Sequence, residues 1–227
     1  GRFVLGLGSQ IIAHITKRFS MPWSSPAARM REFILAMRAI WDNWHEGKAL
    51  EFAGKFYTHT LMTPFFTPSG NDFGAPKVFL AAVGPKMTEV AGEVADGMIV
   101  HAFTTEKYLR ETTLPSLEKG FAKAGKSRAD FEISYPVFVC TGQTEEELEE
   151  AKKATAQQIA FYGSTPAYKP VLDSVGVGDL QGDLNSMSKQ GRWVEMGELI
   201  TPEIMSEFAI IGEPDKVAGQ IRSWYGD

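Results

Sequence analysis

Short apolar runs alternate along this chain with longer stretches in which apolar residues recur at helical spacing. A short apolar run bounded by turn residues is typical of a buried strand, whereas apolar positions at i, i+3, i+4 and i+7 indicate one face of a helix. The runs that predict strands are 3–8, 77–82, 98–102 and 131–140. This alternation favours a parallel sheet with helices outside it, either a doubly wound sheet or part of a (β/α)8 barrel.

The predicted helices carry recognisable start and stop signals. We expect Ser25 to cap the longest one, with Pro26 at its first position, a buried stripe that ends at Trp44, and Gly47 after its end. Other helices are predicted for 106–124 with an interruption near Pro115, for the stretch from the Thr144–Glu147 capping box to Phe161, for 202–208 and from Pro214 onwards.

The remaining segments are rich in turn-forming residues. Residues 50–57 predict a small hairpin around Ala53 and Gly54, and residues 63–76 predict a loop. Residues 163–193 contain many Gly, Ser and Pro, so we expect them to be irregular. Residues 209–212 form a short apolar step.

The turn from Val83 to Met87 offers the first sign of a binding site. Pro85 suits the first helical position, because its missing N–H would be unpaired there anyway. A glycine such as Gly84 at a helix start lets backbone N–H groups approach a ligand, and the helix dipole favours an anion. The turn is therefore either a phosphate-binding turn or an ordinary Gly-Pro connection.

Composition narrows the class of protein. The chain has 227 residues, of which 44% are hydrophobic and 22% charged, as in a globular protein. Its net charge of -5 gives no electrostatic support for a general nucleic-acid role. The single cysteine, Cys140, cannot form an internal disulfide, which fits a reducing cytoplasm. No apolar stretch reaches transmembrane length, so we expect a cytoplasmic protein that contacts neither membrane nor nucleic acid.

Several segments in a fixed order resemble a known family. They are 3–9, the helix 29–44, the hairpin 51–57, the turn 81–87 and the Ala95–Ile99 stretch. Together they resemble the bacterial luciferase-like superfamily of flavin and deazaflavin oxidoreductases. The Gly84-Pro85-Lys86-Met87 turn most resembles the branch that uses coenzyme F420.

The resemblance implies a fold and a domain organisation. The fold is a TIM (β/α)8 barrel of the luciferase-like type, and residues 1–227 would be one partial domain, from about strand 4 to helix 7. The chain shows too few strands for a whole barrel, and a strand should follow the last helix, so we expect an incomplete barrel. Residues 163–208 would form an insertion over the active-site mouth, and the full-length protein would be a homodimer.

The resemblance also assigns roles to residues at strand ends. The positions that would contact the cofactor are Gly8, Ser9, His14, Val83, Gly84, Lys86, Met87 and His101. Val83 and Gly84 would present backbone groups to the ribityl chain or phosphate, and His101 would touch the phosphate. His14 is the catalytic candidate, as a hydrogen-bond or proton donor beside the cofactor ring; a capping or core histidine is the alternative.

Other polar and aromatic residues have simpler interpretations. Asp96 fits a structural turn, and Cys140 fits packing as a small apolar side chain. Lys17 and Arg18 either reach the acidic tail of a deazaflavin or form a solvated face. Phe65 and Phe66 would be buried in the core or line a substrate pocket. The four histidines show no metal-ligand spacing.

These observations lead to a functional hypothesis with open alternatives. The first is an F420-dependent oxidoreductase that transfers hydride to or from a small organic substrate. The second is an FMN-dependent monooxygenase, a flavoprotein that acts on paired donors with incorporation or reduction of molecular oxygen. The third is a non-catalytic flavin-binding or structural barrel. A phosphosugar-type barrel enzyme would need a catalytic lysine or carboxylate pair, which the visible strand ends lack.

Overall fold

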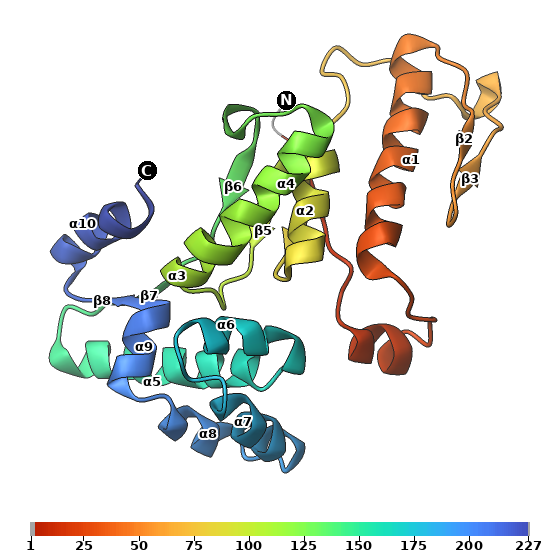
Figure 1. The fold of residues 1–227 in the computed structure, drawn as a ribbon. Helices are drawn as coiled ribbons and strands as arrows, with labels where there is room; N and C mark the ends of the chain where they lie inside the picture. The colour runs from red at the N-terminus through yellow and green to blue at the C-terminus, as the bar shows by residue number, and fades with distance from the viewer. Residues whose placement is uncertain (1–2, 227) are drawn as a thin grey trace. The chain divides into compact units, whose positions relative to one another are not determined.

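A four-stranded sheet organises the first half of the chain in the computed structural model, which describes residues 3–226. Its strands are β1 (Val4–Leu7), β4 (Lys77–Ala82), β5 (Gly97–Val100) and β6 (Glu132–Ser134), in the order β1-β4-β5-β6. Figure 1 labels β5 and β6 of this sheet. β1 runs parallel to β4, and β5 runs parallel to β6. The expected parallel sheet is therefore confirmed.

The described chain forms two compact units. The first contains residues 3–99 and 115–134, and the second contains residues 100–114 and 135–226. The first unit is built on the four-stranded sheet. The second contains its own parallel pair, β7 (Phe138–Cys140) and β8 (Ala209–Ile211), with Phe138 opposite Ala209.

The apolar run 131–140 does not form the single strand that its composition predicts. Its two ends become β6 and β7, which belong to different sheets. Pro136 lies between them, and a proline cannot donate a ladder hydrogen bond. The hydroxyl of the neighbouring Tyr135 instead donates to the carbonyl of Thr104, 2.9 Å away. The prediction of one continuous strand was wrong for this local reason.

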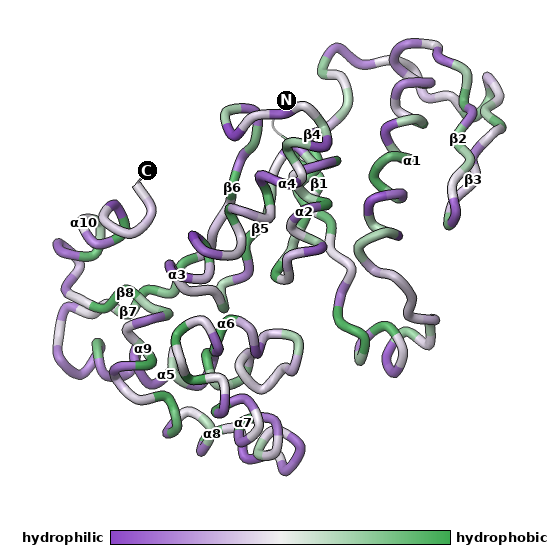
Figure 2. Tube along the Cα trace, in the orientation of Figure 1, coloured by the Kyte–Doolittle hydropathy of each residue, from purple (hydrophilic) through white to green (hydrophobic). Residues whose placement is uncertain are grey.

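The longest helix, α1 (Pro26–Glu46), begins and ends where the sequence indicates, but without the expected cap. Ser25 has a left-handed backbone (φ 42°) and its side chain makes no capping hydrogen bond. The usual N-cap geometry needs an extended backbone, so Pro26 rather than Ser25 defines this helix start. Gly47 ends the helix with φ 67°. Hydrophilic and hydrophobic residues alternate along α1 (Figure 2).

The hairpin β2 (Phe52–Ala53) and β3 (Thr58–His59) is held against α1 by one carboxylate. Glu32 accepts hydrogen bonds from the N–H groups of Lys55, Phe56 and Tyr57, at 3.0, 2.5 and 2.6 Å respectively. Desolvation opposes ionisation, but these three donors outweigh it and lower the pKa of Glu32. The turn spans residues 54–57 and is closed by a hydrogen bond from the Gly54 N–H to the Tyr57 carbonyl. It therefore lies after the predicted position at residues 53–54.

Two helices of the first unit approach closely at small residues. α2 (Pro85–Val94) and α4 (Leu114–Ala124) lie side by side in Figure 1. A Cβ added at Gly92 would meet the Leu117 carbonyl oxygen at 2.5 Å, and one added at Gly120 would overlap the backbone of α2. Only glycine allows this distance between the two backbones.

The helix predicted for 106–124 is interrupted, as expected near Pro115. It consists of α3 (Glu106–Tyr108), a π-helical stretch from Leu109 to Thr113, and then α4. Because Pro115 has no N–H to donate to the preceding turn, the wider π turn accommodates it.

Asp96 fixes the connection between α2 and β5. Its Oδ2 accepts hydrogen bonds from the Val78 N–H at 2.8 Å and from the Arg38 guanidinium at 2.9 Å. Arg38 also donates to the Val94 carbonyl, at 3.0 and 3.1 Å, and Lys126 donates to the Ala95 carbonyl at 2.8 Å. One turn thus joins β4, α1 and the segment after α4. Asp96 serves structure, as the sequence indicates.

Residues 163–193 are helical, which contradicts the prediction of an irregular segment. After α5 (Glu145–Gly163) come α6 (Lys169–Ser174), α7 (Leu180–Lys189) and α8 (Trp193–Met196), followed by α9 (Pro202–Phe208) and α10 (Pro214–Tyr225). Most of the Gly and Pro residues lie near helix boundaries: Gly176 and Gly191 have φ 79° and 74°. Each short helix buries a few apolar side chains, such as Leu172, Leu184 and Met196. Tertiary burial, rather than local propensity, stabilises them.

The remaining short elements are single helical turns. They are the π turn His14–Arg18 and the 3-10 turns Pro64–Phe66, Arg128–Asp130, Pro166–Tyr168 and Gly197–Leu199.

Replacing Asp96 by alanine is expected to destabilise the protein by about 1.5–3 kcal/mol. The change removes a charged acceptor and leaves both the Val78 N–H and Arg38 with one fewer partner. The free energy of unfolding in urea measures the effect. Glu132→Ala is the control, because its ion pair with Lys77 is exposed to solvent and should contribute little to stability. Equal losses in the two variants would contradict the structural role of Asp96.

Candidate functional site

The ends of β1 and β4 bring two of the candidate segments together. The register pairs Leu7 with Leu80, so Gly8 and Ser9 continue alongside Ala81 and Ala82. A Cβ placed on Gly8 would lie 3.6 Å from the Ala81 methyl group. The Ser9 hydroxyl makes only a local hydrogen bond, to the Gln10 carbonyl at 3.3 Å. At the end of β4, the chain continues through Val83 to Gly84.

The amino-terminal end of α2 is open and uncapped. Gly84 is its N-cap residue, with φ −79° and ψ 154°, and no side chain caps the helix. Helix geometry therefore leaves the N–H groups of Lys86 and Met87 without an intrahelical acceptor. A Cβ built on Gly84 would meet nothing within 4 Å. The turn presents donors to an open space, while the Gly84 carbonyl accepts from Thr88 at 3.1 Å.

The side chains around this turn differ in exposure. Lys86 is exposed, whereas Val83 and Met87 are half-buried. Met87 follows the apolar stripe of α2, which buries Val90, Ala91 and Val94. An anion at this turn would meet backbone N–H groups first and the Lys86 ammonium second.

His14 lies at the start of the π turn His14–Arg18 and has an unsatisfied polar atom. Its Nδ1 is buried and has no hydrogen-bond partner among the described residues. Leaving such an atom unpaired costs about 1–3 kcal/mol, so a partner from outside the protein chain is expected. Lys17 and Arg18 are exposed on the same turn. Within residues 3–226, no hydrogen bond or ring contact joins His14 to the Gly84 turn.

His101 directly follows β5 and belongs to an aromatic cluster in the second unit. Its Nδ1 accepts a hydrogen bond from the Phe103 N–H at 3.0 Å. Its ring lies 4.7 Å from the Tyr162 ring, edge to face at 86°, and 4.8 Å from the Tyr168 ring at 46°. Phe103 stacks in turn on Phe208, at 4.7 Å and 25°.

This environment fixes the chemical state of His101. Since Nδ1 is an acceptor, the proton of the neutral ring sits on Nε2, which becomes a donor. Burial lowers the pKa of His101 below its ordinary value, because desolvation disfavours the charged ring. Both the hydrogen bond to Nδ1 and the lowered pKa favour a neutral side chain that donates through Nε2.

Tyr162 and Tyr168 were not singled out by the sequence. Tyr162 comes one residue after the predicted end of a helix, and Tyr168 lies in the segment predicted to be irregular. Nothing in the linear sequence connects either residue to His101, which is about sixty residues earlier. The only local signal is the occurrence of aromatic residues among many Gly, Ser and Pro.

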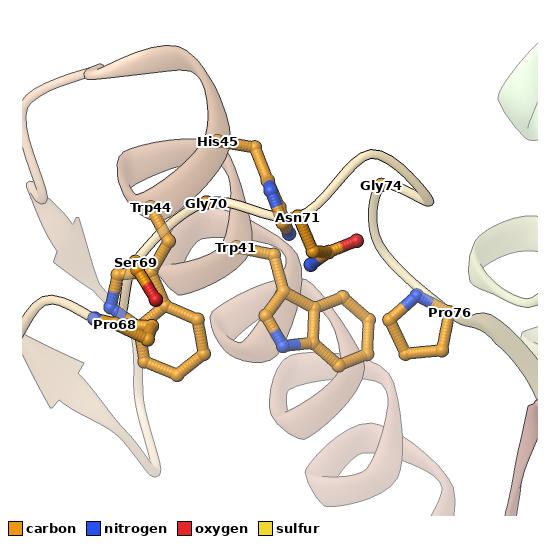
Figure 3. Close-up of a pocket in the computed structure, with 9 residues that line it drawn as sticks. All are labelled: Trp41, Trp44, His45, Pro68, Ser69, Gly70, Asn71, Gly74 and Pro76. Carbon is orange, nitrogen blue, oxygen red and sulfur yellow. The ribbon is translucent and has the colours of Figure 1, made fainter.

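A shallow pocket of about 190 Å³ lies elsewhere in the first unit. Trp41, Trp44 and His45 from the end of α1 line it together with the loop 68–76, and Figure 3 shows Trp41, His45 and Asn71 facing the same space. Pro76 borders the pocket just before β4 begins, whereas Gly84 follows that strand. At about 3.3 Å per residue, six strand residues separate the two by about 20 Å. The pocket is thus distinct from the Gly84 turn.

Several minor expectations can be compared with the structure. Cys140 is fully buried, as expected for a small apolar side chain. Phe65 and Phe66 are 90% and 73% exposed, so the expectation of core burial was wrong; their loop carries them away from the core.

Across residues 3–226 no cluster of His, Cys, Asp and Glu suits a metal ion. In the same range, no helix is both long and apolar enough to cross a membrane.

Comparison with known proteins identifies similar chains. A family model described as luciferase-like monooxygenase matches residues 1–227. An uncharacterized protein of Mycobacterium tuberculosis is 52% identical over 223 residues, which cover 98% of this chain and 66% of that protein. The 5,10-methylenetetrahydromethanopterin reductase of Archaeoglobus fulgidus is 29% identical over 225 residues, 97% of this chain and 63% of that protein.

A solved structure shares the fold. The coenzyme F420-dependent tetrahydromethanopterin reductase from Methanopyrus kandleri superposes with a TM-score of 0.78 at 22% identity, covering 100% of this chain and 66% of that one. At this identity the likeness concerns the fold alone. The chain spans 63–66% of the length of these three proteins.

The buried neutral His101 predicts an acid-dependent loss of stability. The unfolded chain takes up a proton near the ordinary pKa of 6.5, whereas folded His101 resists it to a lower pH. Between those two values the unfolded state binds more protons, so stability falls as the pH falls, by up to about 1.4 kcal/mol per pH unit.

The free energy of unfolding at pH 7.5 and 5.5 measures this dependence. The His101→Gln variant is the control, because it keeps every other titrating group. The variant should lose less stability on acidification than the wild-type protein. Identical pH dependence in both proteins would rule out this effect.

Proposed function

The chain belongs to the luciferase-like monooxygenase family. We propose that it is part of an oxidoreductase and that it binds coenzyme F420 at the amino-terminal end of α2. The fold is that of luciferase-like TIM barrels, of which the described strands form an unclosed part. Two of the similar proteins are named as methanopterin reductases, one of them as F420-dependent. The proposal for this chain rests on the open turn at Gly84.

The residues of that turn fit an anionic group. The helix has no side-chain cap, its first N–H groups are free of intrahelical acceptors, and no atom lies within 4 Å of a Cβ at Gly84. Lys86 adds an exposed cation at the same place. A phosphate group would satisfy these donors and be favoured by the helix dipole.

The other candidates of the first unit would complete the cofactor site. When bound, coenzyme F420 supplies hydride transfer to or from an organic substrate. Gly8 and Ser9 follow β1, the strand beside β4, where Gly8 has no side chain to block a ligand and Ser9 offers a hydroxyl. Val83 and Met87 would flank the cofactor with half-buried apolar surface and exclude water.

His14 is proposed as the catalytic residue of this site. Its buried Nδ1 lacks a partner among the described residues, so it can exchange a proton or hydrogen bond with a bound group without losing an existing contact. We propose that His14 acts as a hydrogen-bond or proton donor beside the reacting ring.

His101 is proposed as a further cofactor contact, from its place directly after β5. As a neutral ring with Nδ1 engaged, it would donate from Nε2 to a phosphate or hydroxyl oxygen.

Residues 163–208 are proposed to be an insertion of this family member. We also propose that the full-length protein is a homodimer in the cytoplasm.

An FMN-dependent monooxygenase is the second candidate function. The family model is described as luciferase-like monooxygenase, and FMN also carries a phosphate that the α2 terminus would accept. Absorbance titrations with coenzyme F420 and with FMN separate the two. Tight binding of FMN with no binding of F420 would overturn the preference for F420, and failure to bind either would favour a non-catalytic barrel.

The variant Gly84→Ala is expected to bind the cofactor at least about tenfold more weakly, a loss of about 1.4 kcal/mol. The added methyl group occupies the open space that the phosphate would need. The backbone of Gly84 is one that alanine adopts readily, and this gain opposes the preference for glycine over alanine at an N-cap, so stability should change by less than about 1 kcal/mol.

A matched control for this variant is Gly219→Ala in α10. A Cβ there also meets nothing within 4 Å, so it introduces the same change away from the turn. Cofactor affinity is measured by absorbance titration, and stability by urea denaturation. Unchanged affinity in Gly84→Ala would remove the turn from the binding site.

The variant His14→Ala is expected to lower kcat by about 10²–10⁴-fold if the residue transfers a proton, with a smaller effect on cofactor affinity. Steady-state kinetics with the identified cofactor measure the effect, and His14→Gln tests whether hydrogen bonding alone suffices. Normal turnover and affinity in His14→Ala would end this assignment.

A further inference from the structure

His101 is held from three directions within the second unit. The Phe103 N–H meets Nδ1 at 3.0 Å, Tyr162 from the end of α5 lies on one side, and Tyr168 from the turn Pro166–Tyr168 lies on another. Both tyrosines are half-buried. The ring has little freedom to flip, because a flip would remove the acceptor from the Phe103 N–H.

The segment after His101 is fixed by the same helices. Phe103 is fully buried and contacts Tyr168 at 5.9 Å as well as Phe208 of α9. The Thr105 hydroxyl lies 3.5 Å from the Ser174 hydroxyl of α6 and caps the Tyr108 N–H. The position of the Phe103 N–H, and with it the acceptor role of Nδ1, therefore depends on residues 162–208.

We propose that Tyr162 and Tyr168 are positioning residues that hold His101 as a neutral Nε2–H donor for an oxygen of the bound cofactor. The proposed donor role rests on the proposed function, whereas the state of the ring does not. A proton added at Nδ1 would point at the Phe103 N–H, so this geometry selects the neutral form. The cofactor would therefore gain a hydrogen bond from His101 without a charge.

The two tyrosine rings have two opposing effects on the charge of His101, and this makes the arrangement testable. An aromatic face within about 6 Å attracts a cation and would favour a charged imidazole. Burial by the same rings disfavours the charged form. Tyr162 and Tyr168 are the titratable groups that face His101, and no charged side chain among the described residues contributes to its shifted pKa.

Long-range proton–nitrogen NMR spectra of the ¹⁵N-histidine-labelled protein, recorded from pH 5 to 9, test the proposal. The signal of His101 is assigned by its loss in His101→Gln. We expect an unprotonated Nδ1, a protonated Nε2 and a pKa below the ordinary value for histidine. A protonated Nδ1 at neutral pH in the wild-type protein, or a pKa at or above the ordinary value, would overturn the proposal.

The tyrosines are tested by Tyr168→Leu and Tyr162→Leu, with Tyr168→Phe as the conservative variant. Loss of a ring should shift the pKa of His101 towards the ordinary value and mix its two tautomers, while Tyr168→Phe should restore the wild-type spectrum. Tyr57→Leu is the control, because Tyr57 stacks on a different histidine, His59, at 6.5 Å. An unchanged His101 spectrum in both leucine variants would refute the positioning role.

Titration with coenzyme F420 at pH 6 and pH 8 separates this inference from the proposed function. If His101 donates as a neutral group, its contribution, measured as the affinity ratio of wild-type protein to His101→Gln, should change less than twofold between the two pH values. A ratio that falls more than threefold at pH 8 would indicate a charged contact and contradict the inference. Absence of F420 binding would refute the proposed function and the donor role, while the NMR result would still decide the state of the ring.

Discussion

The carboxylate of Asp96 is the constraint on which the first unit depends. It accepts from the backbone of β4 and from Arg38 of α1 at the point where α2 ends and β5 begins. Because α2 is fixed at this end, and packs against α4 through Gly92 and Gly120, the direction of its other end is also fixed. The open Gly84 turn is at that other end. The structural carboxylate of Asp96 thus orients a candidate binding turn that it does not contact.

The two candidate histidines, His14 and His101, differ in the hydrogen bonding of their Nδ1 atoms. His14 has a buried Nδ1 without a partner among the described residues, so its hydrogen-bonding capacity is available to a ligand. His101 has the same atom engaged by a backbone N–H, which leaves only Nε2 free to act. Unpaired polar atoms are costly, and their presence at candidate positions favours a ligand there. The α2 terminus adds unpaired backbone donors of the same kind.

Residues 163–208 contribute more to the second unit than their sequence indicates. Their helices are short, and each would be unstable by itself. They form because they bury Leu172, Leu184 and Met196 against one another and against α5. In doing so they place Tyr168 beside His101. These helices thus influence the environment of the histidine without altering the strand that precedes it.

The sequence by itself determined the elements whose signals are local. Strand 77–82, the proline starts of α1 and α2, and the Thr144–Glu147 capping box follow from neighbouring residues. The resemblance to the family follows from the order of several such segments along the chain. Tertiary structure decided the rest. The split at Pro136, the helices within 163–193, the hydrogen bonds of Glu32 and the contacts of Tyr162 and Tyr168 join residues far apart in the chain. Their free energy comes from burial and from hydrogen bonds made only after folding, which no local pattern encodes.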